Sequence, residues 1–300
     1  MRVAVSGASG LIGSALSTEL TAAGDEVVKL VRRDAMSANE VRWDPSSSLD
    51  PTALSGVDAV VHLAGAPIAA KRWTDARKAV LRTSRIESTR TLTMAMAAAM
   101  PPPRVLVCGS AIGFYGDTGG EVVDESGPAG TGFLPDLVRD WEIAAEPAEE
   151  AGVRVTFIRS GVVLAAEGGM LARLMLPFRL GLGARIGAGT QYLSWISLTD
   201  EVRAIRFVLD QHDLAGPVNL TAPEPVTNAE FTQVLAKVLR RPSLFTLPSP
   251  VLSATLGELA SELLASARVV PARLRQAGFT FRNPDISAAL TTIVAAQRAG

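Results

Sequence analysis

Val3-Ala4-Val5-Ser6-Gly7-Ala8-Ser9-Gly10-Leu11-Ile12-Gly13 is the stretch that decides the fold. An apolar run breaks into three glycines spaced three residues apart, and apolar residues then recur every four positions at Ile12, Leu16 and Leu20. This pattern predicts a strand, a tight glycine turn and a helix. A second apolar run at Glu26–Val31 predicts the next strand and completes a strand–helix–strand unit.

The three glycines, Gly7, Gly10 and Gly13, fit a phosphate-binding turn. In such a turn one glycine permits the sharp bend, one lets the backbone approach a pyrophosphate, and one lets the helix pack closely on the strand. The helix N-terminus offers unpaired N–H groups and the positive end of its dipole to the phosphates. A purely structural glycine turn is the alternative. The strand before the turn and the helix after it favour dinucleotide binding.

Two arginines, Arg32 and Arg33, end the second predicted strand, about 20 residues after the third glycine. An acidic residue at this place grips the ribose hydroxyls of NAD, whereas an arginine accommodates the 2′-phosphate of NADP. The planar guanidinium suits phosphate oxygens. We therefore expect NADP(H) as the cofactor, with two solvated charges at a strand end as the alternative.

Composition excludes several classes of protein. The chain has 300 residues and a formal net charge of −1, which gives no sign of a nucleic-acid or membrane-surface partner. Cys108 is the single cysteine, so an internal disulfide and a cysteine-based zinc site are excluded, and we expect no metal. No apolar run approaches the ~20 residues that span a bilayer. Because no signal sequence precedes the first strand, we expect a cytoplasmic protein.

The remaining pattern predicts an α/β Rossmann fold, a doubly wound parallel sheet with a smaller, mostly helical C-terminal substrate region. Further strands are expected at 41–44, 58–65, 104–110 and 153–158, with helices over 70–99, 133–150 and 228–239. The dinucleotide-binding domain is expected to cover 1–164. Residues 195–222 are expected to return to it, with Trp195-Ile196 and Val218-Asn219-Leu220 as strands of the main sheet. That leaves 165–194 and 223–300 for the substrate region.

The predicted strand ends supply further candidates. Ligands of doubly wound sheets bind outside the carboxyl ends of the strands, so Leu63-Ala64-Gly65 is expected along the cofactor, mainly through its backbone. His62 is a candidate base, but a histidine inside an apolar strand is more often a packed core residue. Arg85 either faces the cofactor phosphates or belongs to a solvated helix face. Cys108 reads as a small buried apolar residue.

The whole chain resembles the extended short-chain dehydrogenase/reductase superfamily. Within it the chain is most similar to the atypical proteins of the nucleoside-diphosphate-sugar epimerase family, which end in a C-terminal domain of unknown function. The matching motifs are 7–13, His62-Leu63-Ala64-Gly65-Ala66-Pro67-Ile68, Arg72-Trp73-Thr74, Ser84-Arg85-Ile86, Arg159-Ser160-Gly161-Val162-Val163-Leu164, 177–183, Ser194-Trp195-Ile196 and 228–231. The resemblance implies a Rossmann fold, NADP(H) binding and a C-terminal substrate region, but no particular reaction.

The usual proton relay of that superfamily is missing. Its members use a Ser or Thr together with a Tyr and a Lys four residues later, where the ammonium favours the phenolate. The expected position holds Leu137-Val138-Arg139-Asp140-Trp141-Glu142, in which Trp141 replaces the Lys and is expected in the core. The two tyrosines, Tyr115 and Tyr192, have no Lys four positions on.

Several polar residues are candidates for the roles that remain. Ser110 and Tyr115 are the catalytic candidates, although each has an ordinary structural alternative as a strand-end hydroxyl or a packed ring. Gln191 and Trp195 are candidates for lining a substrate pocket. The residues expected to contact the cofactor are Gly7, Ser9, Gly10, Leu11, Ile12, Gly13, Arg32, Arg33, Leu63, Ala64, Gly65, Arg85, Ser110 and Val163.

The sequence leaves two functions open. One is an NADP(H)-dependent, epimerase-like oxidoreductase that acts on a small molecule with a different acid or with little proton assistance. The other is a non-catalytic NADP(H)-binding sensor or regulator. We expect a monomer or a homodimer in either case.

Overall fold

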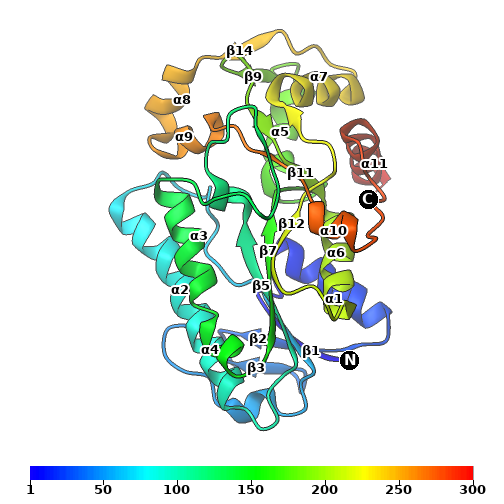
Figure 1. The fold of residues 1–300 in the computed structure, drawn as a ribbon. Coiled ribbons are helices and arrows are strands. Elements are labelled where there is room, and N and C mark those ends of the chain that lie inside the picture. Colours follow the sequence, from blue (N-terminus) through cyan, green and yellow to red (C-terminus); the bar gives the residue numbers. More distant parts are fainter. Residues whose placement is uncertain (300) are drawn as a thin grey trace.

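A seven-stranded parallel sheet runs through the centre of the computed structural model, which describes residues 1–299 (Figure 1). Its order is β12-β7-β5-β4-β1-β2-β3. The strands are β1 (Arg2–Ser6), β2 (Glu26–Val31), β3 (Glu40–Arg42), β4 (Ala59–His62), β5 (Val105–Ala111), β7 (Arg154–Ser160) and β12 (Gly216–Leu220). The chain builds β2 and β3 on one side of β1 and then crosses to β4 on the other. This reversal between β1 and β4 is where doubly wound sheets bind ligands.

Helices cover both faces of this sheet, which confirms the predicted α/β doubly wound class. In Figure 1, α1 and α6 lie on one side of the strands, whereas α2, α3 and α4 lie on the other. Their bounds are α1 (Leu11–Ala22), α2 (Asp75–Ala98), α3 (Phe133–Ile143), α4 (Glu146–Glu150) and α6 (Leu198–Asp210). The helix expected at 70–99 starts only at Asp75, where the Thr74 side chain caps it, and the one expected at 133–150 is divided before Pro147.

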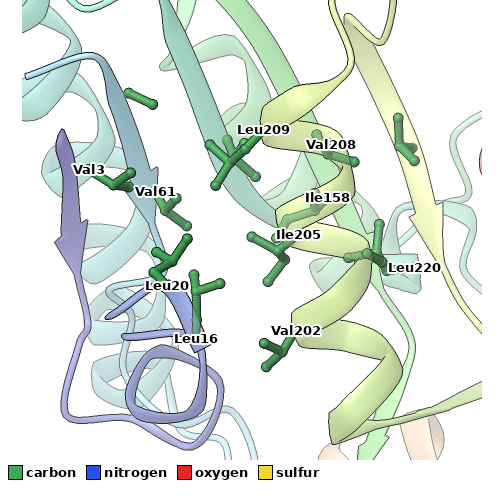
Figure 2. Close-up of a cluster of buried hydrophobic side chains, with 14 of the residues drawn as sticks. Val3, Leu16, Leu20, Val61, Ile158, Val202, Ile205, Val208, Leu209 and Leu220 are labelled. Atoms are coloured by element: carbon green, nitrogen blue, oxygen red, sulfur yellow. The ribbon is translucent and has the colours of Figure 1, made fainter. Parts of the chain in front are cut away.

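The packing of α1 against α6 fixes the first helix over the sheet (Figure 2). Val202, Ile205 and Val208 recur at helical spacing along α6, and they share one buried cluster with Leu16 and Leu20 of α1. Burial of each such side chain is worth about 1.5–3 kcal/mol. The glycine turn before α1 is therefore mounted on a rigid support.

Shorter elements form the rest of the described chain. Two-stranded pairs join β8 (Val162–Leu164) to β11 (Trp195–Ser197), β10 (Tyr192–Leu193) to β13 (Val226–Thr227), β9 (Ala184–Ile186) to β14 (Phe245–Leu247), and β6 (Val122–Val123) to β15 (Arg268–Val269). The helices are α5 (Gly169–Arg179), α7 (Asn228–Leu239), α8 (Ser249–Leu256), α9 (Leu259–Leu264), α10 (Ala272–Gln276) and α11 (Ile286–Ala299), and the 3-10 turns are η1 (Pro51–Leu54) and η2 (Ile112–Tyr115).

The predicted return to the main sheet is half right. The strand expected at 218–220 forms within β12 and pairs with β7. The strand expected at Trp195-Ile196 also forms, but it pairs with β8 outside the main sheet. Local apolar patterning indicates a strand here, whereas its partner depends on where the preceding excursion leaves the chain.

Candidate functional site

The three glycines of the first turn have three different surroundings. Gly7 has a φ of +71°, and a Cβ there would lie 2.7 Å from the backbone of Leu63. A Cβ on Gly13 would overlap the Gly7 carbonyl oxygen, so this glycine allows α1 to pack against the turn. Gly10 is exposed, and its Cβ would meet only the Gly7 oxygen, at 3.2 Å. The backbone at Gly10 is thus open to an approaching group.

The amino end of α1 is well suited to an anion. Gly10 is its N-cap and supplies no side-chain hydrogen bond, and the first turn carries no acidic residue. Ser9 is exposed beside it, while Leu11 and Ile12 are partly buried. The first N–H groups of the helix and its dipole therefore favour negative charge here.

The two arginines after β2 differ in their partners. Arg33 donates to both oxygens of Glu40, at 2.8 and 2.6 Å, and this ion pair lowers the pKa of that carboxyl to about 2. Arg32 is exposed and has no hydrogen-bond or ion-pair partner within residues 1–299. Arg32 is therefore the arginine of this pair that is available to a ligand.

At the end of β4, Arg85 from α2 lies against the backbone. A Cβ on Gly65 would come 3.3 Å from the Arg85 guanidinium carbon. The same guanidinium lies 5.2 Å from the ring centre of Trp141. Burial, followed by the nearby charge of Arg77, lowers the pKa of Arg85 to about 10. This arginine faces the Gly65 turn rather than a solvated helix surface.

His62 is a packed core residue, which agrees with the structural alternative to a role as a base. Its Nδ1 lies 2.6 Å from the Ser6 hydroxyl and its Nε2 lies 3.2 Å from the Ser88 hydroxyl. The ring is fully buried, and this burial lowers its pKa to about 4. A neutral imidazole with both nitrogens engaged is a poor general base at neutral pH.

Behind the end of β5 lies a fully connected polar network. Ser110 donates to Glu142 Oε1 at 2.6 Å, and Arg159 donates to both oxygens of Glu142 at 2.8 Å. Arg159 also donates to the Tyr115 hydroxyl at 3.1 Å, and Tyr115 in turn donates to Asn219 at 2.8 Å. The Arg159 and Glu142 side chains are only 4% and 12% exposed, so the pair is well shielded from water.

Apolar side chains occupy the two positions at which the superfamily's Tyr and Lys are expected. Leu137 is 1% exposed and Trp141 is 7% exposed. The Trp141 indole donates to the Thr89 hydroxyl at 2.9 Å, which satisfies its one donor. Trp141 is thus a core residue, and neither position presents an acid or a cation.

The segment after β8 passes over the start of α1. A Cβ on Gly168 would lie 3.4 Å from a Leu11 methyl, and one on Gly169 would lie 3.3 Å from the Val163 carbonyl oxygen. Val163, Leu63 and Ile12 are partly buried and pack against one hydrophobic cluster. The structure therefore brings these predicted cofactor residues together at one edge of the sheet.

The two candidates for a substrate pocket separate. Gln191 lines a cavity of about 480 Å³ between the 117–120 loop, the 186–192 segment and Ser249, Leu264 and Ser266. Trp195 is fully buried in a different place, and its indole donates to the Glu224 carbonyl at 3.1 Å. Trp195 therefore does not line the cavity that Gln191 lines.

Two further observations concern residues 1–299 as a whole. No group of three or more His, Cys, Asp or Glu side chains is arranged to hold a metal ion in this range. None of the helices described is both long and apolar enough to cross a membrane.

Comparison with known proteins places this geometry in a family. Residues 3–220 match the family described as NAD dependent epimerase/dehydratase, and residues 247–293 match a domain of unknown function, DUF1731. The chain belongs to the NAD-dependent epimerase/dehydratase family. The predicted family and the C-terminal domain of unknown function are both confirmed.

Relatives of this epimerase-family chain span its whole length. It is 50% identical over 290 residues to the epimerase family protein MT2273 of Mycobacterium tuberculosis, covering 96% of each chain. It is 36% identical over 299 residues to human epimerase family protein SDR39U1, covering 98% of this chain and 100% of the relative. The crystal structure of human SDR39U1 with NADPH superimposes with a TM-score of 0.91 at 35% identity, over 98% of this chain and 99% of that one. The predicted NADP(H) agrees with that relative's ligand.

Sequence reasoning missed Glu142, Arg159 and Asn219 as a connected set. A charged residue closing an apolar strand is a visible signal for Arg159, and an amide inside an apolar run is one for Asn219. The partners themselves are invisible in the sequence, because Tyr115 and Asn219 lie 104 positions apart.

Proposed function

We propose that this chain binds NADP(H) across the carboxyl edge of its main sheet and uses it to oxidise or reduce a small molecule. The observation that carries the proposal is the open amino end of α1 at Gly10 together with the unpartnered Arg32 at the end of β2. The first suits a pyrophosphate and the second suits the 2′-phosphate. The NADPH bound by human SDR39U1 supports the same assignment.

Each part of the proposed cofactor site has its own task. Arg32 binds the 2′-phosphate, while Arg33 stays with Glu40 and shapes the strand end. Arg85 sits at Gly65 and supplies a positive charge along the bound dinucleotide. The residues that would hold the cofactor are Gly7, Ser9, Gly10, Leu11, Ile12, Gly13, Arg32, Leu63, Ala64, Gly65, Arg85, Ser110 and Val163.

When bound, NADP(H) accepts or supplies a hydride, and the chain must then manage the accompanying proton without a Tyr–Lys pair. Ser110 has donated its single proton to Glu142, so its free lone pair can accept a hydrogen bond from a substrate hydroxyl. The Tyr115 hydroxyl already donates and accepts, and burial raises its pKa. We therefore assign the substrate contact to Ser110 and give Tyr115 the task of holding Arg159.

We also propose which parts of the chain bind the cofactor and which bind the substrate. Residues 1–164 with 195–222 form the dinucleotide-binding unit, and 165–194 with 223–300 form the substrate region. Gln191, at its cavity, belongs to the latter. A monomer or a homodimer remains the expected assembly.

The test is a search for hydride transfer. The full chain is incubated with nicotinamide-tritiated NADPH and a library of small carbonyl compounds, and tritium is followed into product. We expect stereospecific transfer to one class of compound. Ser110→Ala should lower this rate at least tenfold while the variant still binds NADPH, whereas Ser253→Ala, at an exposed position on α8, should leave the rate unchanged.

One observation favours a non-catalytic NADP(H) sensor. Leu137 and Trp141 fill the relay positions with buried apolar groups, so the proton donor typical of the superfamily is absent there. A sensor predicts tight NADPH binding with no tritium transfer across the whole library. Transfer to any compound by the wild-type chain, lost in Ser110→Ala, contradicts the sensor.

A further inference from the structure

The cationic side chains of α2 differ sharply in their partners. Lys78 forms an ion pair with Glu258, and Arg82 forms one with Asp140. Arg77, Arg85 and Arg90 make no ion pair with any acid within residues 1–299, and of these three only Arg90 is exposed. Arg77 and Arg85 are therefore the partly buried cations of this helix that have no counter-charge among the described residues.

The two partly buried arginines without acids, Arg77 and Arg85, converge on one turn. Arg85 lies against Gly65, and Arg77 donates through Nη2 to the Pro67 carbonyl. Their Cα atoms are two helical turns apart, about 12 Å along the axis at 1.5 Å per residue. Both guanidinium groups nevertheless reach the turn that follows β4, and their charges interact, as the lowered pKa of Arg85 indicates.

The Arg77 guanidinium also has unused hydrogen-bonding capacity. Its Nε is buried and has no hydrogen-bond partner within the described residues. Buried donors in native proteins nearly always have a partner, and leaving one unmade costs about 1–3 kcal/mol. A charged group with an unmet donor, beside a second cation, is the arrangement expected where a ligand supplies the missing acceptor.

We propose that Arg77 binds a carboxylate or phosphate group of the substrate, beside the dinucleotide held by Arg85. The guanidinium fork recognises the two oxygens of such a group with parallel hydrogen bonds. Because Arg85 is assigned to the cofactor, the inference rests on the proposed function. It narrows the substrate to small molecules that carry an acidic group, and it assigns Arg77 to the substrate and Arg85 to the cofactor.

Inorganic phosphate is the probe for this site. The thermal stability of the full chain is measured with increasing phosphate at constant ionic strength, once with saturating NADPH and once without it. A ligand that binds only the native state raises the midpoint temperature in a saturable way. We expect such a rise in the NADPH-loaded wild type, at least a tenfold weaker phosphate response in Arg77→Gln, and an intermediate response in Arg77→Lys. Arg90→Gln, exposed on the same helix, is the matched control and should respond as the wild type does.

The outcomes separate the possible sources of the anion. NADPH affinity in Arg77→Gln should stay within twofold of the wild type. If Arg77→Gln weakens NADPH as much as Arg85→Gln does, Arg77 serves the cofactor and the inference is wrong. An unchanged phosphate response in Arg77→Gln also overturns it. Should the wild type bind no NADPH, the proposed function fails, yet the cofactor-free arm still tests whether Arg77 holds an anion.

Discussion

Replacing Glu201 with Gln should stabilise the protein, and increasingly so as the pH rises. Glu201 lies in the first turn of α6 and is fully buried. Its Oε1 accepts a hydrogen bond from the Ser160 hydroxyl at 2.6 Å, while its Oε2 has no partner within residues 1–299. Removal from water raises the pKa of this carboxyl from 4.5 to about 8. At neutral pH the folded protein thus keeps the proton.

The sign of the effect follows from proton linkage. Below pH 4.5 the carboxyl is protonated in both states, so the group contributes no pH dependence. Between pH 4.5 and about 8 the unfolded chain releases the proton and the folded chain keeps it, so the free energy of unfolding falls as the pH rises. The fall is about 1.4 kcal/mol per pH unit, or about 3 kcal/mol by pH 7, and it levels off above pH 8. Gln cannot ionise and keeps the acceptor for Ser160, so the variant avoids this loss.

The assay is urea unfolding of the wild type and Glu201→Gln at pH 5, 6, 7 and 8. The difference between the two free energies of unfolding cancels the other titrating groups. We expect it to grow by about 3–4 kcal/mol between pH 5 and pH 8 in favour of the variant. Glu19→Gln, at an exposed position on α1, is the control and should give a flat difference. A change below about 1 kcal/mol for Glu201→Gln would show that the carboxyl is not desolvated and would refute the reasoning.

Three further changes test the proposed site. Arg32→Gln should weaken NADPH binding about 10- to 100-fold, since a charged hydrogen bond is worth about 1.5–3 kcal/mol, and should leave NADH binding unchanged; equal losses for both in calorimetric titration would move the 2′-phosphate elsewhere. Gly10→Val should abolish NADPH binding, because its side chain blocks the approach of the pyrophosphate to the backbone. The free energy of unfolding should change by less than about 1 kcal/mol, because only one atom neighbours the new Cβ. Retained NADPH binding would contradict the assignment of an open backbone at Gly10. Glu142→Gln should lower the free energy of unfolding in urea by about 3 kcal/mol, because Arg159 is left buried without its counter-charge. A loss below about 1 kcal/mol would mean that water solvates the Arg159–Glu142 pair.

The first turn shows how much of the site local sequence could predict. The spacing of Gly7, Gly10 and Gly13 predicted one glycine for the bend, one for backbone approach and one for close packing. The structure gives each of these surroundings to one glycine, because a turn of this size is built from near neighbours in the chain. The bounds of α7 were equally local: the helix forms over Asn228–Leu239 as expected, and the Thr227 side chain caps it.

Features that depend on distant segments could not be predicted. Tyr115 is an obvious catalytic candidate in a chain with two tyrosines, yet its hydroxyl already donates to Asn219 and accepts from Arg159. Trp195 follows Gln191 by four residues, but in the strand that pairs with β8 its side chain is buried in the core. No local pattern encodes which strand becomes a neighbour, so the sequence alone left both residues as candidates.

Two arginines among the residues proposed to hold the cofactor, Arg32 and Arg85, have no acidic partner in the described part of the chain. The chain has a net charge of −1, so its cations are not in excess overall. Arg33, next to Arg32 after β2, and Arg159, near the end of β7, each form an ion pair with an acid. In the described part of the chain, Arg32 and Arg85 lie along the sheet's carboxyl edge without one. Arg85 is partly buried and Arg32 is exposed, and the described residues give neither an acid, so a ligand with acidic groups at both places would complete their pairing. A dinucleotide with phosphates at two separated points meets that requirement.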